Sequence, residues 1–136
     1  MDDLRELRTR RNLTQVQLAE KSGVPQNQIS MLETGDRPMS DAVARKLAPV
    51  LGVDELMLKN GHSLTRYKAQ AERGELDPKK ALSTADFLSM SLNDPNLKPE
   101  YRRVIIGITL ELTDLAAKSL EKRRDELEQL EWAEKG

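Results

Sequence analysis

The chain has 136 residues, with 22 basic and 23 acidic side chains, so its formal net charge at pH 7 is −1. This length accommodates one ordinary domain or two small ones and excludes a large multi-domain enzyme. With no cysteine, one histidine and only four aromatic residues, the composition excludes disulfides and thiolate metal sites and favours helices packed by aliphatic side chains.

The first 60 residues show short helical patterns of apolar residues separated by compact turns. The pattern stops at residues 60–63, Asn-Gly-His-Ser, which predict a linker. We therefore expect His62 to be an exposed loop residue. The apolar residues that mark the successive helices are Leu4 and Leu7, then Val16, Leu18 and Ala19, then Ile29 and Leu32, then Val43, Leu47 and Leu51, and finally Leu56 and Leu58.

Residues 14–35 carry the pattern of two short helices joined by a tight turn. Thr14 and Gln17 form the capping box that begins a helix, and Gly23 suits a turn that needs a positive φ angle. Ala19 is the small residue where the two helices approach closely, and Val24 fills the turn between them. Ile29 and Leu32 turn the inner face of the second helix toward the core. This arrangement is the helix-turn-helix pattern, in which the second helix enters the major groove of DNA.

Beyond this pattern, residues 4–60 resemble the helix-turn-helix domain of the lambdoid phage repressors and Cro proteins. The resemblance implies a five-helix domain whose recognition helix covers residues 26–34. The second half of the chain shows no such resemblance. The motifs that carry it are Leu13-Thr14-Gln15, Leu18-Ala19-Glu20-Lys21, Ile29 to Gly35 with its Leu-Glu-x-Gly ending, Leu47-Ala48 and Leu51-Gly52-Val53.

The resemblance also implies roles for individual side chains. Gln15 matches a glutamine that contacts the DNA backbone and braces the recognition helix, and Arg37 is a phosphate candidate in the following loop. Met31 is placed to touch a thymine methyl group. Arg8 and Glu33 match a structural ion pair. The other candidates are Gln26, Asn27, Gln28 and Ser30 for the base edges, and Arg10, Arg11 and Lys21 for phosphates.

Three residues and the charge balance depart from the family pattern. Pro49 interrupts the pattern of the fourth helix, and we expect it to kink or shorten that helix. Pro25 stands where many members have a capping Ser or Thr, and Met39 stands where some members reach the minor groove with Arg. Residues 1–60 carry nine basic and nine acidic side chains. A DNA-binding surface here therefore has to come from local rather than net charge.

The second half predicts fewer and longer helices. Asp77 followed by Pro78 predicts a capped helix start, with the helix continuing to about Leu92. A turn at residues 93–96 separates it from a helix that begins at Pro99 and meets no stop signal before the last residue. That helix is about 50 Å long at 1.5 Å per residue. The apolar face expected for the first of the two helices is Leu82, Phe87 or Ala85, Leu88 and Met90.

An apolar stripe runs along the long terminal helix in a rhythm of three and four residues. Two interpretations are open: the helix packs on its own chain, or it dimerises with a second copy. We favour dimerisation, because so few other residues remain to cover the stripe. The residues expected at the dimer contact are Tyr101, Ile105, Ile108, Leu112, Ala116, Leu120 and Leu127.

The sequence thus predicts an all-α protein with three parts: a helix-turn-helix DNA-binding domain at 1–60, a linker and short helix at 61–76, and a helical dimerisation or regulatory region at 77–136. We expect a cytoplasmic, homodimeric transcriptional regulator that represses from a palindromic operator on double-stranded DNA. An antirepressor or inducer protein is a candidate partner for its second half. We expect no enzyme activity, metal, cofactor or membrane association. The alternative is a protein-interaction adaptor or coactivator that retains the fold.

Overall fold

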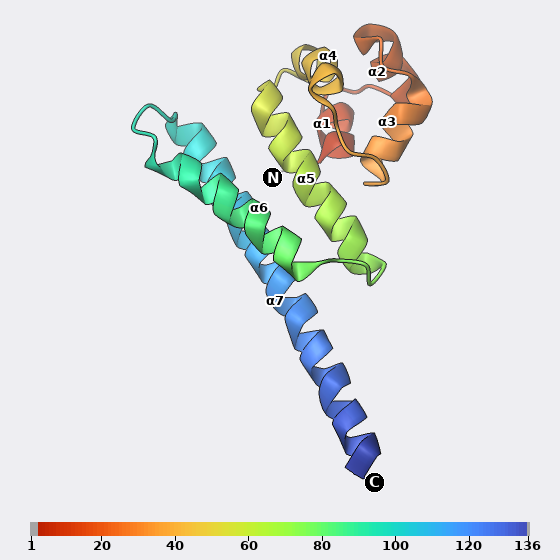
Figure 1. Ribbon diagram of the computed structural model, residues 1–136. Helices are drawn as coiled ribbons and strands as arrows, with labels where there is room; N and C mark the ends of the chain where they lie inside the picture. The colour runs from red at the N-terminus through yellow and green to blue at the C-terminus, as the bar shows by residue number, and fades with distance from the viewer. Residues whose placement is uncertain (1–2, 136) are drawn as a thin grey trace.

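The computed structural model describes residues 3–135, which form an all-helical fold without strands, as the sequence predicts (Figure 1). Four short helices make a bundle, a longer helix leaves it, and two further helices pack against that one. The elements are α1 (Leu4–Arg10), α2 (Gln15–Ser22), α3 (Gln26–Glu33), α4 (Asp41–Leu51), α5 (Glu55–Glu72), α6 (Pro78–Met90), the 3₁₀ turn η1 (Ser91–Asn93) and α7 (Pro99–Lys135).

The N-terminal bundle is organised around one aliphatic core. Leu18 from α2, Ile29 from α3 and Leu47 from α4 are completely buried in it. Leu58, in the first turns of α5, completes this core from the side of the second half. Burying each of these side chains stabilises the fold by about 2 kcal/mol. The bundle therefore needs the beginning of α5 as its fifth helix.

Helix α5 runs without a break through residues 60–63, so the linker predicted there is wrong. Asp54 caps the helix, and its buried residues continue at helical spacing from Met57 and Leu58 through Gly61 and His62 to Leu64. Packing on both sides of α5 outweighs the turn preference of the Asn-Gly pair. The chain turns only after Glu72, at a glycine with positive φ.

His62 is a buried residue rather than the exposed loop residue that the linker prediction required. Only 5% of its surface is exposed. Its ring Nε2 atom lies 2.6 Å from the carbonyl oxygen of Arg37 in the loop between α3 and α4. The histidine therefore ties α5 to the segment that follows α3.

Helices α6 and α7 lie alongside each other and share a second apolar core with α5 (Figure 1). Met57 and Leu64 enter this core from α5, while Leu58 belongs to the first core. Adjacent residues of α5 thus face two different cores. The whole second core consists of Met57, Leu64, Ala85, Leu88, Ile105, Ile108 and Leu112.

The predicted start of α6 is confirmed, and its predicted apolar face is confirmed for Leu88 and for Ala85, the alternative to Phe87, but wrong for the other residues. Asp77 caps the helix and Pro78 occupies its first turn. Phe87 and Met90 are 74% and 68% exposed, and Leu82 is 36% exposed. Small residues face α7 instead, since they let the two helix backbones approach closely. The buried residues of α6 are Pro78, Ala81, Ala85 and Leu88.

The long terminal helix is confirmed, and its first half packs on its own chain. The prediction that this half forms a dimer contact is wrong for four residues, because α5 and α6 cover them to 2% exposure or less. These residues are Ile105, Ile108, Leu112 and Ala116. Tyr101 is also engaged within the chain, since its hydroxyl donates a hydrogen bond to Asp54 at 3.1 Å.

The last part of α7 extends beyond α6 (Figure 1), while residues from Leu115 to Glu126 still line a groove with the end of α5 and the turn that follows it. Leu120 and Leu127 are 45% and 60% exposed, and Leu130 and Trp132 are exposed as well. At about 1.5 Å per residue the whole helix is about 55 Å long. No helix in the described part of the chain has an apolar stretch that could cross a bilayer.

Candidate nucleic-acid interface

The α2-turn-α3 unit is built by strong local signals. The Thr14 hydroxyl and the Gln17 side chain form the reciprocal capping box at the start of α2, as predicted. Gly23 ends α2 with φ of +81°, a conformation that favours glycine. Val24 follows it and is 1% exposed. The angle between the two helices is therefore set by a glycine turn and an apolar plug.

Helix α3 has one buried face and one polar face. Ile29 and Leu32 face the core, with 0% and 1% exposure. Gln26 and Asn27, in the first turn, are exposed, and Met31 is 45% exposed. Of the other two base-edge candidates, Gln28 and Ser30 are each half-buried. Amide side chains on such a helix face match the donor and acceptor pattern of base edges, and a methionine matches a methyl group.

A buried polar network holds the start and end of α3 in place. The Glu33 carboxylate has no exposed surface and lies 2.8 Å from both Nε and Nη2 of Arg8. Gln15 Nε2 donates to the other oxygen of Glu33 at 2.6 Å, and Gln15 Oε1 accepts from Gln26 Nε2 at 3.5 Å. The network runs from α1 through the end of α3 and the start of α2 to the first residue of α3. Gln15 therefore positions Gln26 directly.

Helix α3 lacks a side-chain cap, as the proline at its capping position predicts. Pro25 precedes α3 with φ of −58°, and no side chain caps the free amides of the first turn. The ring fixes the backbone angle that the helix start requires. These unpaired amides at the positive end of the helix dipole are available to an anion such as a phosphate.

The loop between α3 and α4 is fastened to α5 by contacts that local sequence patterns do not reveal. Gly35 has φ of +79°, and a Cβ atom there would lie 2.9 Å from that of Ala69 on α5. Asp36 pairs with Arg73 at the end of α5, and hydrogen bonds from Thr34 and Arg73 lower the pKa of the Asp36 carboxyl. The contacts of this loop with Ala69 and Arg73 join residues more than 30 positions apart.

The cations predicted to bind phosphate are differently placed. Arg37 is exposed in the loop after α3, and Lys21 is exposed in the last turn of α2. Arg10 and Arg11 are exposed at the end of α1, and the Arg11 guanidinium lies over Gly52 at the C-terminus of α4. That end of a helix attracts a cation, so Arg11 has a structural contact that does not require DNA.

Contacts within the chain account for much of the acidic charge of the N-terminal half. Asp41 pairs with Lys59, and Glu55 lies near Arg45. Asp3 and Asp54 cap α1 and α5, where a negative charge is favourable. Glu33 is fully covered by its own network. A zero net charge is therefore compatible with a polar, partly basic surface around α3.

Groups of His, Asp and Glu side chains that could hold a metal ion do not occur among residues 3–135. The features that the chain does assemble are an ordered pair of helices, an outward amide face and nearby cations. This arrangement suits recognition of a polar surface.

Comparison with known proteins agrees with this geometry. A family model described as helix-turn-helix matches residues 4–58, which cover α1 to α4 and the first residues of α5. No curated protein and no solved structure matches the chain. The family match thus covers the N-terminal bundle and leaves α6 and α7 outside it.

Proposed function

We propose that this protein is a dimeric transcriptional repressor of the phage or mobile-element type, and the helix-turn-helix family match over residues 4–58 supports a DNA-binding regulator. Its recognition helix α3 enters the major groove of a palindromic operator, and it acts in the compartment that contains the DNA. The repressor type is supported by the resemblance of residues 4–60 to phage repressors. The polar face of α3 is the observation that carries the proposal.

The amides at the start of α3 are the proposed readers of sequence. Gln26 and Asn27 are exposed, and the Gln15–Glu33–Arg8 network restricts the side chain of Gln26 before DNA arrives. A side chain already held in place loses little conformational entropy on binding. Met31 adds an apolar contact one turn further along, and Arg37 and Lys21 supply phosphate contacts around it.

Selection from randomised duplex DNA by the purified full chain, repeated at two salt concentrations, tests this assignment. We expect an enriched inverted repeat, and about a hundredfold loss of affinity for it in Gln26→Ala with Asn27→Ala, because each amide discriminates its base by one or two factors of ten. The matched control is Asn93→Ala with Gln129→Ala, which removes two exposed amides elsewhere. Equal binding by the wild type and the α3 variant would contradict the proposal.

The second half of α7 provides the proposed dimer contact. An isolated helix of this length is marginally stable in water, and the ion pairs Asp114–Lys118 and Glu131–Lys135 add only a few tenths of a kcal/mol each. Apolar residues on its seam are nevertheless exposed. A second copy of the same helix covers them and places two α3 helices for half-sites about 34 Å apart. The seam consists of Leu120, Arg123, Leu127, Leu130 and Glu134.

Leu127→Glu tests this contact by placing a charge on the seam. We expect the variant to sediment as a monomer and to lose about a hundredfold in affinity for the inverted repeat, because the two half-sites are no longer linked. Gln129→Glu adds the same charge two residues away, off the seam, and leaves the dimer intact. A dimer of unchanged stability in Leu127→Glu would exclude this part of α7 as the interface.

Repression follows, in this proposal, from exclusion of polymerase at the operator. A promoter reporter that carries the selected site should rise in expression when the protein is removed. Unchanged or lower expression would argue for activation or for no regulatory effect.

A protein-interaction adaptor is the second candidate function. The exposed side chains of Phe87 and Met90 on α6 favour it, since they provide apolar surface outside the helix-turn-helix domain. An antirepressor or inducer protein could use the same surface of a repressor. Failure of the DNA selection at both salt concentrations, with a folded dimer, would favour the adaptor.

A further inference from the structure

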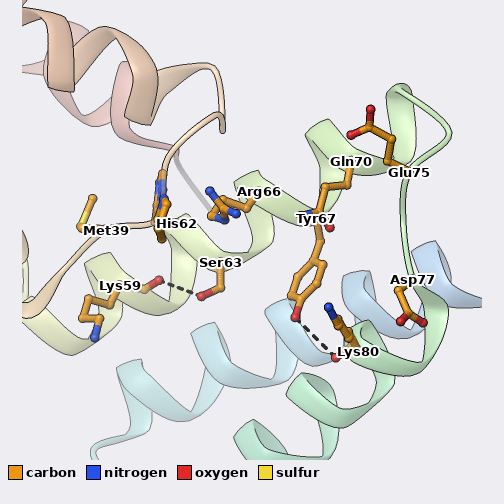
Figure 2. Close-up of a pocket in the computed structure, with 11 residues that line it drawn as sticks. Met39, Lys59, His62, Ser63, Arg66, Tyr67, Gln70, Glu75, Asp77 and Lys80 are labelled. Atoms are coloured by element: carbon orange, nitrogen blue, oxygen red, sulfur yellow. Dashed lines mark hydrogen bonds between the residues drawn. The ribbon is translucent and has the colours of Figure 1, made fainter.

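A trough runs along one face of α5, between the loop that follows α3 and the turn that precedes α6 (Figure 2). Its volume is about 530 Å³, enough for a small molecule. Met39 closes it at one end, and Tyr67 extends toward Lys80 at the other, where its hydroxyl donates to the Lys80 carbonyl oxygen. The trough lies between the DNA-binding domain and the second half of the chain.

Two buried polar atoms of the residues that line this trough are unsatisfied. Nδ1 of His62 and Nη1 of Arg66 have no hydrogen-bond partner within the described part of the chain. Each unsatisfied group of this kind costs about 1–3 kcal/mol, and native folds rarely leave such groups without a purpose. The two residues are four positions apart on α5, so their side chains are neighbours on one helix face. Neither atom is exposed to solvent in this structure, so a single small ligand reaches both only when neighbouring side chains of the trough move aside.

The protonation state of His62 defines what such a ligand must offer. A carbonyl oxygen only accepts, so Nε2 carries the hydrogen that is donated to Arg37. Burial lowers the pKa of His62, the bond to the Arg37 carbonyl raises it in part, and the nearby charge of Arg66 lowers it further. The ring is therefore neutral at pH 7, and Nδ1 is an acceptor that needs a donor. Arg66 Nη1 is a donor that needs an acceptor.

Arg66 is the cation that favours an anion at this end, since its Nη1 atom has no partner within the described part of the chain. Lys80 also lines the trough, against Glu75 and Asp77, whereas the charge of Lys59 is paired with that of Asp41. The Asp77 carboxylate caps the start of α6, where it accepts a hydrogen bond from the Lys79 backbone amide at 3.0 Å. The charge of Arg66 also acts on the Asp36 carboxylate and lowers its pKa. That carboxylate is already paired with Arg73.

We propose that the trough binds a small oxyanion that also carries a hydroxyl hydrogen, with inorganic phosphate as the simplest member and hydroxy acids as larger ones. The oxyanion accepts from Arg66 Nη1, and its hydroxyl donates to His62 Nδ1. Sulfate has the same shape as phosphate but lacks the hydroxyl hydrogen near pH 7. It therefore satisfies Arg66 and leaves His62 unpaired.

The bound ligand also regulates DNA binding, and this part of the inference rests on the proposed function. His62 holds the Arg37 carbonyl with one nitrogen and the ligand with the other, so a bound ligand polarises and tightens the bond to the loop. Arg37 is a proposed phosphate contact. Occupancy of the trough thus changes the affinity for DNA through one residue that touches both sites.

Binding is tested on the full chain, without DNA, by titrating inorganic phosphate or sulfate at constant ionic strength and following backbone amide NMR signals. We expect saturable shifts centred on His62, Ser63 and Arg66, with phosphate bound about fivefold more tightly than sulfate, the effect of one hydrogen bond. Arg66→Gln should weaken phosphate binding about tenfold or more. Arg103→Gln, an exposed arginine on α7, is the matched control and should change nothing.

Two results would overturn the site: linear, unsaturable shifts spread over many surface cations, or binding that Arg66→Gln and Arg103→Gln affect equally. Either one means that water satisfies the two buried atoms. Equal affinity for phosphate and sulfate would exclude the role of His62. The regulatory part is measured separately, as operator affinity with and without saturating phosphate. An anion site with unchanged operator affinity refutes the regulation alone, and absence of any operator refutes the proposed function alone.

Discussion

The two halves of the molecule differ in how many large apolar side chains they expose to solvent. Among the described residues, only Val16, Met31 and Leu56 are large, apolar and exposed before residue 60, whereas nine such residues lie between 82 and 132. The N-terminal bundle buries its aliphatic side chains and presents amides, while the second half leaves leucines, a phenylalanine and a tryptophan uncovered. The difference supports the proposal that the first half binds a polar partner and the second half an apolar one.

Helix α5 belongs to both halves, so they are not independent. Leu58 packs into the N-terminal core, and Met57 and Leu64 pack into the core formed with α6 and α7. The loop after α3 is fastened to the same helix through Asp36 and His62. Any disturbance of α5 in the second core therefore reaches the segment that follows the recognition helix.

The largest expected effect tests whether the two cores unfold together. Ile108→Ala removes a completely buried side chain from the second core and should lower the free energy of unfolding by about 3 kcal/mol. Because α5 is shared, urea unfolding followed by circular dichroism should show one transition, and NMR signals of the Ile29 methyl groups should disappear in it.

Ile106→Ala is the matched control for this prediction. Ile106 lies two residues away and is 41% exposed, so its removal should cost less than about 1 kcal/mol. If Ile108→Ala produced a second transition, with the N-terminal bundle still folded above it, the halves would be separate folding units.

A smaller effect is expected from the network that holds α3. Glu33→Ala leaves the Arg8 guanidinium, whose side chain is only 12% exposed, and the Gln15 amide without their shared partner. The free energy of unfolding should fall by about 2 kcal/mol, because a mostly buried charge loses its counter-charge. The measurement is urea unfolding of Glu33→Ala and of a control variant, Glu128→Ala, against the wild type.

Glu128→Ala removes the partner of Arg124 on the projecting part of α7, where both side chains are more than 60% exposed. Exposed pairs of this kind contribute little to stability, so this variant should unfold at the same urea concentration as the wild type. Equal losses in the two variants would mean that the Glu33 network stabilises the fold no more than a surface pair does.

The sequence predicted best where the signal was local. The capping box at Thr14 and Gln17, the turn at Gly23 and the cap at Asp77 each depend on residues within a few positions, and the structure contains all three. The start and length of α7 followed in the same way, from a proline and the absence of a stop signal.

Prediction failed where packing between distant segments decided the outcome. Gly61 and His62 have the composition of a turn, but α4, α6 and α7 surround α5 and keep it helical. On α6 the hydrophobic pattern favoured Phe87, whereas close approach of α7 selects Ala81 and Ala85. Periodicity finds an apolar stripe, but it does not say whether the same chain or a second copy covers it.

The smallest expected effect concerns pH and the contact between the two halves. The pKa of His62 lies below its ordinary value of about 6.5, chiefly because burial disfavours the charged ring. The unfolded chain therefore takes up this proton more readily than the folded one as the pH falls below about 6.5. Stability is complete above that pH and is lost as the pH decreases toward the folded pKa of His62. The carboxyls of Asp36 and Asp41, whose pKa values are lowered by their partners, contribute only at much lower pH.

Because the chain has a single histidine, its ring signals can be titrated by NMR without overlap. We expect a midpoint below about 6.5 in the folded protein and near 6.5 in urea, with a lower urea midpoint of unfolding at about pH 5.5 than at about pH 7.5. His62→Asn should lose this difference between the two pH values. A ring that titrates at 6.5 or above in the folded chain would show that water reaches His62, and that the buried contact between α5 and the Arg37 carbonyl opens in solution.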